Sequence, residues 1–284
     1  MSVPDEIARE SLDMLRGWRA EFVDFIDALV AAESPSTVPE AQDEVRAHLG
    51  HALASVGLQV RHVAGERTGG HLLAAPPGAD SGPRQLLIGH MDTVWPLGTL
   101  RQMPISIEEG VFKGPGVFDM KAGLAMGIFA LRALAESGVT PSVAPVFLIN
   151  SDEEIGSPES EVLIVEQARS ADRAFILEPA LGTVGHIKTR RKGVGHFTVR
   201  VHGKSAHGGL APEEGASAIL ELARVIQDLH ALADHDRGIT VNVGVIEGGS
   251  RSNVVPALAS AEVDVRVWTN EDAREIEGRL SVRV

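Results

Sequence analysis

Three short apolar segments constrain the fold of this 284-residue chain more than any other feature. They lie at residues 85–89, 144–149 and 174–177, and such continuous apolar runs are typical of strands that are buried on both faces. A helical pattern at residues 121–135 separates the first two runs. Because strands that alternate with helices usually build parallel sheets, the sequence predicts an α/β domain with a mostly parallel sheet.

Each predicted strand is followed directly by side chains that can bind a metal ion. His90 and Asp92 follow the first strand. Glu153 and Glu154 follow the second, and Glu178 follows the third. Open α/β sheets bind ligands beyond the carboxyl ends of their strands, so we expect these side chains at one edge of the sheet. The chain has no cysteine, which leaves nitrogen and oxygen atoms as metal ligands.

Taken one at a time, these residues have ordinary structural explanations. A His-x-Asp pair such as His90 and Asp92 is more often a histidine satisfied by its neighbour than a metal site. Asp119 precedes a predicted helix, where an aspartate is more often an N-cap than a ligand. Glu153 and Glu154 are compatible with a solvated loop, although adjacent carboxylates repel each other unless a cation or proton compensates. Only the complete set indicates a metal site.

The sequence pattern changes near residue 191, where apolar and polar positions begin to alternate. Alternation of this kind predicts antiparallel strands with one solvated face. Three strands are predicted after this point, at residues 196–201, 239–246 and 261–267. Two helices are predicted as well, one at residues 212–232 and one that begins near residue 270. The sequence therefore predicts two domains, at residues 1–190 and 191–284, of which the second is a smaller α+β domain.

Charge and hydrophobicity exclude several classes of partner. The formal net charge is −13, which argues against binding to nucleic acid or to anionic membranes. The apolar runs are far shorter than the roughly 18 residues of a membrane span, and the first residues lack a hydrophobic signal region. We therefore expect a cytoplasmic protein that acts on a small substrate.

Five segments occur in a characteristic order along most of the chain. They read GHMDTV (residues 89–94), GPGVFDMKAG (114–123), SDEEIGS (151–157), EP (178–179) and GKSAH (203–207). In this order they resemble the M20 family of metallopeptidases, most closely its glutamate carboxypeptidases. The resemblance implies a di-zinc catalytic domain of the aminopeptidase and carboxypeptidase type. It also implies a smaller ferredoxin-like domain that acts as a lid and forms a homodimer.

The resemblance assigns the metal ligands residue by residue. It implies that His90 and Glu178 bind one zinc ion, that Glu154 binds the second, and that Asp119 bridges both. Asp92 would orient His90. Co²⁺ and Mn²⁺ are alternatives to Zn²⁺.

The resemblance also implies roles for residues around the reacting bond. Glu153 would be the general base, which takes a proton from water and later transfers it to the departing amine. His207, in the smaller domain, would stabilise the oxyanion. Asn253 and Arg266 would hold the substrate, and the two-pronged guanidinium of Arg266 suits a carboxylate. On spacing alone, an outward-facing strand residue is an equally good explanation of Arg266.

These roles predict zinc-dependent hydrolysis of the amide bond in an N-acyl or peptidyl amino acid, with glutamate as the expected leaving group. A deacylase of the acetylornithine or succinyl-diaminopimelate type is the alternative. Family members usually take a last zinc ligand from a histidine in a C-terminal segment, and no histidine follows His235 here. We therefore expect that the chain lacks its C-terminal part and holds only one zinc ion well, which leaves a noncatalytic metal-binding protein as a further alternative.

Overall fold

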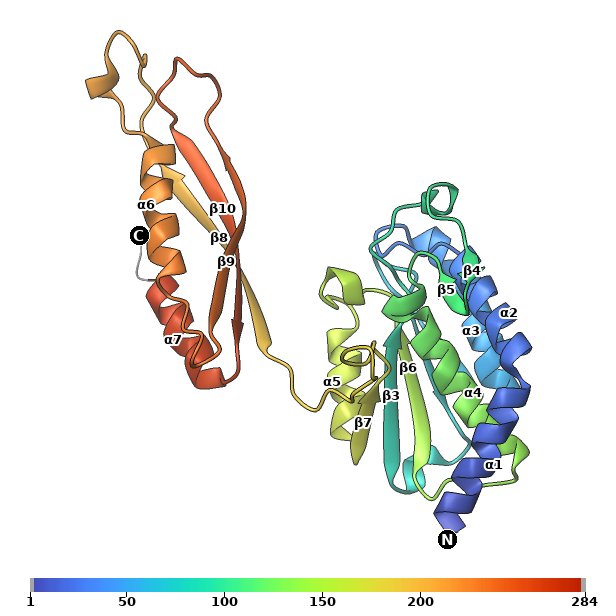
Figure 1. Cartoon of the computed structure of the whole chain (residues 1–284). Coiled ribbons are helices and arrows are strands. Elements are labelled where there is room, and N and C mark those ends of the chain that lie inside the picture. The colour runs from blue at the N-terminus through green and yellow to red at the C-terminus, as the bar shows by residue number, and fades with distance from the viewer. Residues whose placement is uncertain (1–2, 282–284) are drawn as a thin grey trace. The chain divides into compact units, whose positions relative to one another are not determined.

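The computed structural model describes residues 3–281, which fall into two compact units, Met1–Ala180 (unit 1) and Leu181–Val284 (unit 2) (Figure 1). Among residues 3–281, every helix is too short or too polar to span a membrane. The domain boundary predicted at residue 190 stays a prediction.

Unit 1 is built on a five-stranded sheet with the strand order β1-β2-β6-β3-β7. Its strands are β1 (Gln59–Val63), β2 (His71–Ala75), β3 (Arg84–His90), β6 (Ala144–Asn150) and β7 (Arg173–Ile176). Strand β3 pairs in parallel with β6 and with β7, whereas β2 is antiparallel to both β1 and β6. The predicted α/β class is confirmed. The sheet is mixed rather than mostly parallel, because the chain turns back on itself between β1 and β2.

Helices cover both faces of this sheet. The helices of unit 1 are α1 (Val3–Gly17), α2 (Arg19–Ala31), α3 (Gln42–Ser55), α4 (Ala122–Glu136) and α5 (Glu161–Arg169). Leu87, Phe147 and Ile149 point into a core shared with α2, α3 and α4. Their neighbours Leu86 and Leu148 point to the opposite face, where they pack with side chains of α5. This alternation explains why successive positions are apolar at residues 86–88 of β3 and at residues 144–149 of β6.

The third apolar run does not form the expected buried strand. All four residues of β7 are exposed, and Ile176 is 62% exposed. Within the described part of the chain, β7 is the edge strand and pairs only with β3. Burial on both faces was therefore the wrong expectation for this run, because apolar composition alone does not distinguish an edge strand from a central one.

The described part of unit 2 contains a three-stranded antiparallel sheet with the order β8-β10-β9 and two α-helices. Its elements are β8 (Gly193–His202), β9 (Thr240–Gly248), β10 (Leu258–Val267), α6 (Ala218–His230) and α7 (Asn270–Ser281). Along β10, Val263 and Val265 are buried, whereas Glu262 and Arg266 are exposed. The predicted one-sided alternation is therefore present, and its apolar side packs with α6 and α7.

Candidate metal centre

The metal-binding side chains predicted from the sequence meet beyond the carboxyl ends of β3, β6 and β7. His90 is the last residue of β3, and Glu178 lies two residues after β7. Glu153 and Glu154 belong to a short turn after β6, η5 (Glu153–Ile155). Asp119 arrives from another direction, in η4 (Val117–Lys121) directly before α4. The parallel pairing of three strands is what brings their ends to one edge of the sheet.

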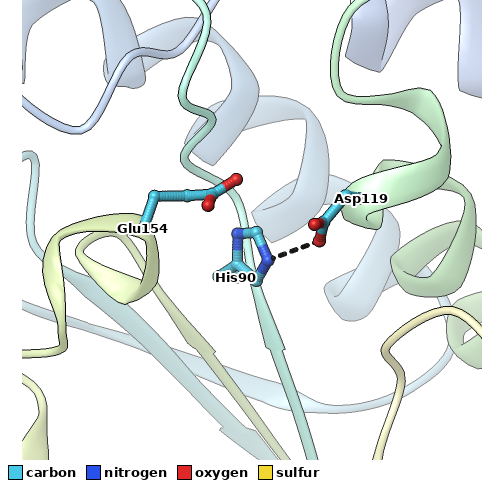
Figure 2. Close-up of side chains that lie close together, drawn as sticks. All are labelled: His90, Asp119 and Glu154. Atoms are coloured by element: carbon cyan, nitrogen blue, oxygen red, sulfur yellow. Dashed lines mark hydrogen bonds and ion pairs between the residues drawn. The ribbon is translucent and has the colours of Figure 1, made fainter. Parts of the chain in front are cut away.

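The imidazole of His90 is the centre of this group. Its Nε2 atom lies 3.2 Å from Asp119 Oδ1, 3.5 Å from Glu178 Oε1 and 4.0 Å from Glu153 Oε2. Figure 2 shows the carboxylates of Asp119 and Glu154 on two sides of the ring, which itself is buried.

Two overlapping groups of potential ligands result. His90, Asp119 and Glu154 form one, and His90, Glu153 and Glu178 form the other. In each group, the ligand atoms lie within 4.8 Å of one another. This spacing is compact enough for a common metal site.

The site concentrates negative charge. Burial alone would lower the pKa of His90, but hydrogen bonds to Asp119, Asp92 and Glu178 raise it to about 12. Burial, together with the negative charge of Asp119 and Glu153, raises the pKa of Glu154 to about 7. Both shifts show that the site favours additional positive charge. Imidazole and carboxylate ligands suit Zn²⁺, Co²⁺ and Mn²⁺, so the residues present fit a divalent metal.

Asp92 connects the candidate metal ligands to the loop behind them. Its carboxylate is fully buried and accepts hydrogen bonds from the Ser36 hydroxyl at 2.6 Å and from the backbone amides of Glu154 at 3.2 Å and Glu153 at 3.3 Å. Nδ1 of His90 lies 3.0 Å from the backbone carbonyl of Asp92 and 3.5 Å from its carboxylate. The shortest contact to His90 thus comes from the main chain, and the carboxylate mainly holds the turn that carries Glu153 and Glu154.

Sequence reasoning missed the residues that support this arrangement from behind. Ser36 is 56 positions away from Asp92 and lies in an irregular segment, where no periodic pattern marks it. Gln42 donates to the carbonyls of Pro35 and Ser151 and accepts from the amide of Gly69. These contacts join distant segments, and no local signal in the sequence could have found them.

Unit 2 carries His207, which was predicted to stabilise the oxyanion, and the two predicted substrate-binding residues, Asn253 and Arg266. Two of these three, His207 and Asn253, are neighbours. Nδ1 of His207 accepts hydrogen bonds from the amides of Gly209 and Leu210, each at 3.1 Å. The next residue along, Gly208, donates to the carbonyl of Asn253 at 2.8 Å.

Arg266 is not part of that loop pair. It lies eight residues after the start of β10, about 27 Å along the strand at 3.4 Å per residue. Its guanidinium contacts Asp264 at 3.1 Å and is half exposed. The structure therefore brings His207 and Asn253 together and leaves Arg266 at the other end of the sheet.

Comparison with known proteins gives consistent matches for both units. Residues 189–283 match the family model of the peptidase dimerisation domain of M20 peptidases. Carboxypeptidase G2 of Pseudomonas sp. (strain RS-16) is 35% identical over 191 residues, which are 67% of this chain and 46% of that protein. The chain spans about half the length of the curated relatives that it matches.

Solved structures of similar fold extend over both units. The aminopeptidase PepT of Bacillus cereus has a TM-score of 0.73 and 27% identity, with 91% of this chain and 68% of that chain covered. The M20 family metallo-carboxypeptidase Sso-CP2 of Sulfolobus solfataricus has a TM-score of 0.71 and 17% identity, with 91% and 74% covered. The second similarity concerns the fold alone.

Proposed function

Because the chain belongs to the M20 family of metallopeptidases, we propose that unit 1 carries the metal centre of a hydrolase that cleaves the amide bond of a peptide or an N-acyl amino acid. The convergence of carboxylates from separate elements on Nε2 of His90 carries this proposal. Carboxylates gathered this closely around a buried imidazole repel one another unless a cation or a proton compensates their charge.

The two ligand groups support a site for two metal ions. We assign His90 and Glu178 to one ion and Glu154 to the other, with Asp119 between them. Asp119 suits the bridging position for two reasons. It belongs to the same ligand group as His90 and Glu154. It also lies 3.2 Å from Nε2 of His90, the atom that Glu178 approaches to 3.5 Å. When bound, such ions polarise the scissile carbonyl and make water more acidic.

Glu153 is the proposed general base. It lies next to a ligand in the chain, and its carboxylate remains half exposed, so it can face both the metal centre and the substrate. Burial raises its pKa, which brings its proton affinity closer to what a base needs at neutral pH. The hydrogen bond from its backbone amide to Asp92 holds it in place.

Substitution of Glu153 tests its assignment as the general base. Glu153→Ala is expected to abolish hydrolysis and to leave the metal content unchanged. Glu108→Ala, at an exposed residue of the β4 strand (Ser106–Glu108), is the control and should change neither. Turnover that survives in Glu153→Ala would show that another group accepts the proton.

For the substrate, we propose an amino acid with a free carboxylate, and glutamate as the best candidate. The identity to carboxypeptidase G2 supports it, and Arg266, whose half-exposed guanidinium also contacts Asp264, is the candidate partner for that carboxylate. Hydrolysis of folyl-glutamate and of N-acetylornithine should be compared side by side. Faster turnover of N-acetylornithine would favour the alternative, a deacylase of the acetylornithine or succinyl-diaminopimelate type.

A metal-binding role without catalysis is the second candidate. In the described residues, both ligand groups contain the same histidine, His90, which we assign to the first ion. The second ion, assigned to Glu154, would then be bound by carboxylates alone. We therefore expect one tightly held zinc ion per chain after dialysis, and the second to be lost. Two retained ions would contradict this expectation.

We also propose that unit 2 forms a homodimer. The match of residues 189–283 to a peptidase dimerisation domain supports this assembly. Light scattering coupled to size-exclusion chromatography should give twice the chain mass of 30.1 kDa. A monomer at all concentrations would rule it out.

A further inference from the structure

The first turn of α4 approaches the main chain beside Glu178 unusually closely. A Cβ atom placed on Gly123 would lie 2.0 Å from the carbonyl oxygen of Leu177 and 3.1 Å from its carbonyl carbon. Real Cβ atoms essentially never come closer than 3.0 Å to such a neighbour. Only glycine allows this contact, because no side chain other than hydrogen fits.

Both partners of the contact are directly connected to metal ligands. Leu177 precedes Glu178, and its amide donates to the carbonyl of Ile88 at 2.9 Å, which ties it to β3. Gly123 follows Asp119 by four residues, through the turn that starts α4. The distance between the start of α4 and the end of β7 therefore also determines the distance between Asp119 and Glu178.

A second glycine fixes the same turn from the side of β3. A Cβ atom on Gly89 would lie 2.5 Å from Cδ2 of Leu124 and 2.9 Å from Cε of Met120. The start of α4 is thus packed against β3, next to His90, and against the end of β7. It cannot move away from one ligand without moving relative to the others.

We propose that Gly123 is a positioning residue, whose missing side chain sets the spacing of Asp119 and Glu178 around His90. The inference rests on the proposed metal-binding function. Widening the contact from 2.0 Å to 3.0 Å requires a shift of about 1 Å. Metal–ligand distances tolerate only about 0.2 Å, so one methyl group is enough to disturb the site.

The experiment compares three glycine-to-alanine variants of the full chain. Gly123→Ala introduces the backbone clash. Gly127→Ala, one turn later in the same helix, meets only side-chain atoms, at 2.8 Å from Leu177 and 3.1 Å from Phe147. Gly50→Ala in α3 is the matched control, since its Cβ atom would be 4.0 Å from the nearest atom.

Affinity for Co²⁺ and the visible spectrum of bound Co²⁺ are measured for each variant, together with thermal unfolding of the metal-free protein. Gly123→Ala should weaken Co²⁺ binding by about tenfold or more and alter the spectrum, as changes that misplace ligands do. Gly127→Ala should lower the unfolding temperature but keep the Co²⁺ affinity within about twofold of wild type. Gly50→Ala should lower neither the unfolding temperature nor the Co²⁺ affinity.

Two results would overturn the inference while the proposed function stands. One is a Gly123→Ala variant that binds Co²⁺ as tightly as wild type, with the same spectrum. The other is complete unfolding of this variant, because Gly123 would then be needed for folding rather than for spacing. A wild-type chain that binds neither Co²⁺ nor Zn²⁺ would overturn the proposed function itself and the inference with it.

Discussion

Ser36→Ala removes a short hydrogen bond to a carboxylate behind the candidate metal ligands. The hydroxyl of Ser36 is buried and donates to Asp92 Oδ2 at 2.6 Å. A hydrogen bond to a charged group contributes about 1.5–3 kcal/mol, and its loss leaves this oxygen with one longer bond, from the amide of Glu154 at 3.2 Å. We therefore expect a loss of about 2 kcal/mol in the free energy of unfolding of unit 1.

This loss should be visible as a lower unfolding temperature. For a domain of this size, about 2 kcal/mol corresponds to roughly 4–8 °C. Tryptophan fluorescence can follow unit 1 by itself in a Trp268→Phe background, because the remaining tryptophans, Trp18 and Trp95, both belong to unit 1. Because Asp92 also holds the turn that carries Glu154, Zn²⁺ affinity should fall by about 10- to 100-fold.

Ser55→Ala is the matched control for this prediction. Its hydroxyl also donates at 2.7 Å, to the carbonyl of Ala52, but it lies on the exposed surface of α3. A surface substitution of this kind changes stability by less than about 0.5 kcal/mol. Equal unfolding temperatures of Ser36→Ala and Ser55→Ala would refute the reasoning that the buried hydroxyl supports Asp92.

Three further substitutions test other parts of the structure. The buried Nζ group of Lys121 donates to the carbonyls of Leu29 and Ala32 at the end of α2, so Lys121→Met should lower the free energy of unfolding in urea by about 3 kcal/mol. Burial would raise the pKa of Glu159, but hydrogen bonds from the segment at residues 66–68 outweigh it and lower the pKa. Its stabilisation is thus present above its ordinary pKa and lost as the pH falls, so the stability difference from Glu159→Gln should shrink between pH 7 and pH 3. Leu222→Ala should destabilise unit 2 by about 2–5 kcal/mol and leave Co²⁺ affinity unchanged.

The hydrophobic pattern was sufficient to locate most elements of the structure. Continuous apolar runs marked β3 and β6, and alternating positions marked β8 and β10. The same pattern failed for β7, whose apolar residues are exposed at a sheet edge. It also did not show that β2 runs antiparallel to β6, because periodicity describes how one strand is buried and not which strand lies beside it.

The sequence by itself determined which ligand atoms the candidate site can offer. It placed His90, Glu154 and Glu178 directly after strands, and the absence of cysteine left only nitrogen and oxygen ligands. The tertiary structure decided how these groups are held: by Ser36 behind Asp92, and by the contact of Gly123 with Leu177. The physical reason is the separation of the contacting residues along the chain. Local patterns follow from the burial of neighbouring residues, whereas contacts between residues more than 50 positions apart exist only once the sheet order and helix packing are formed.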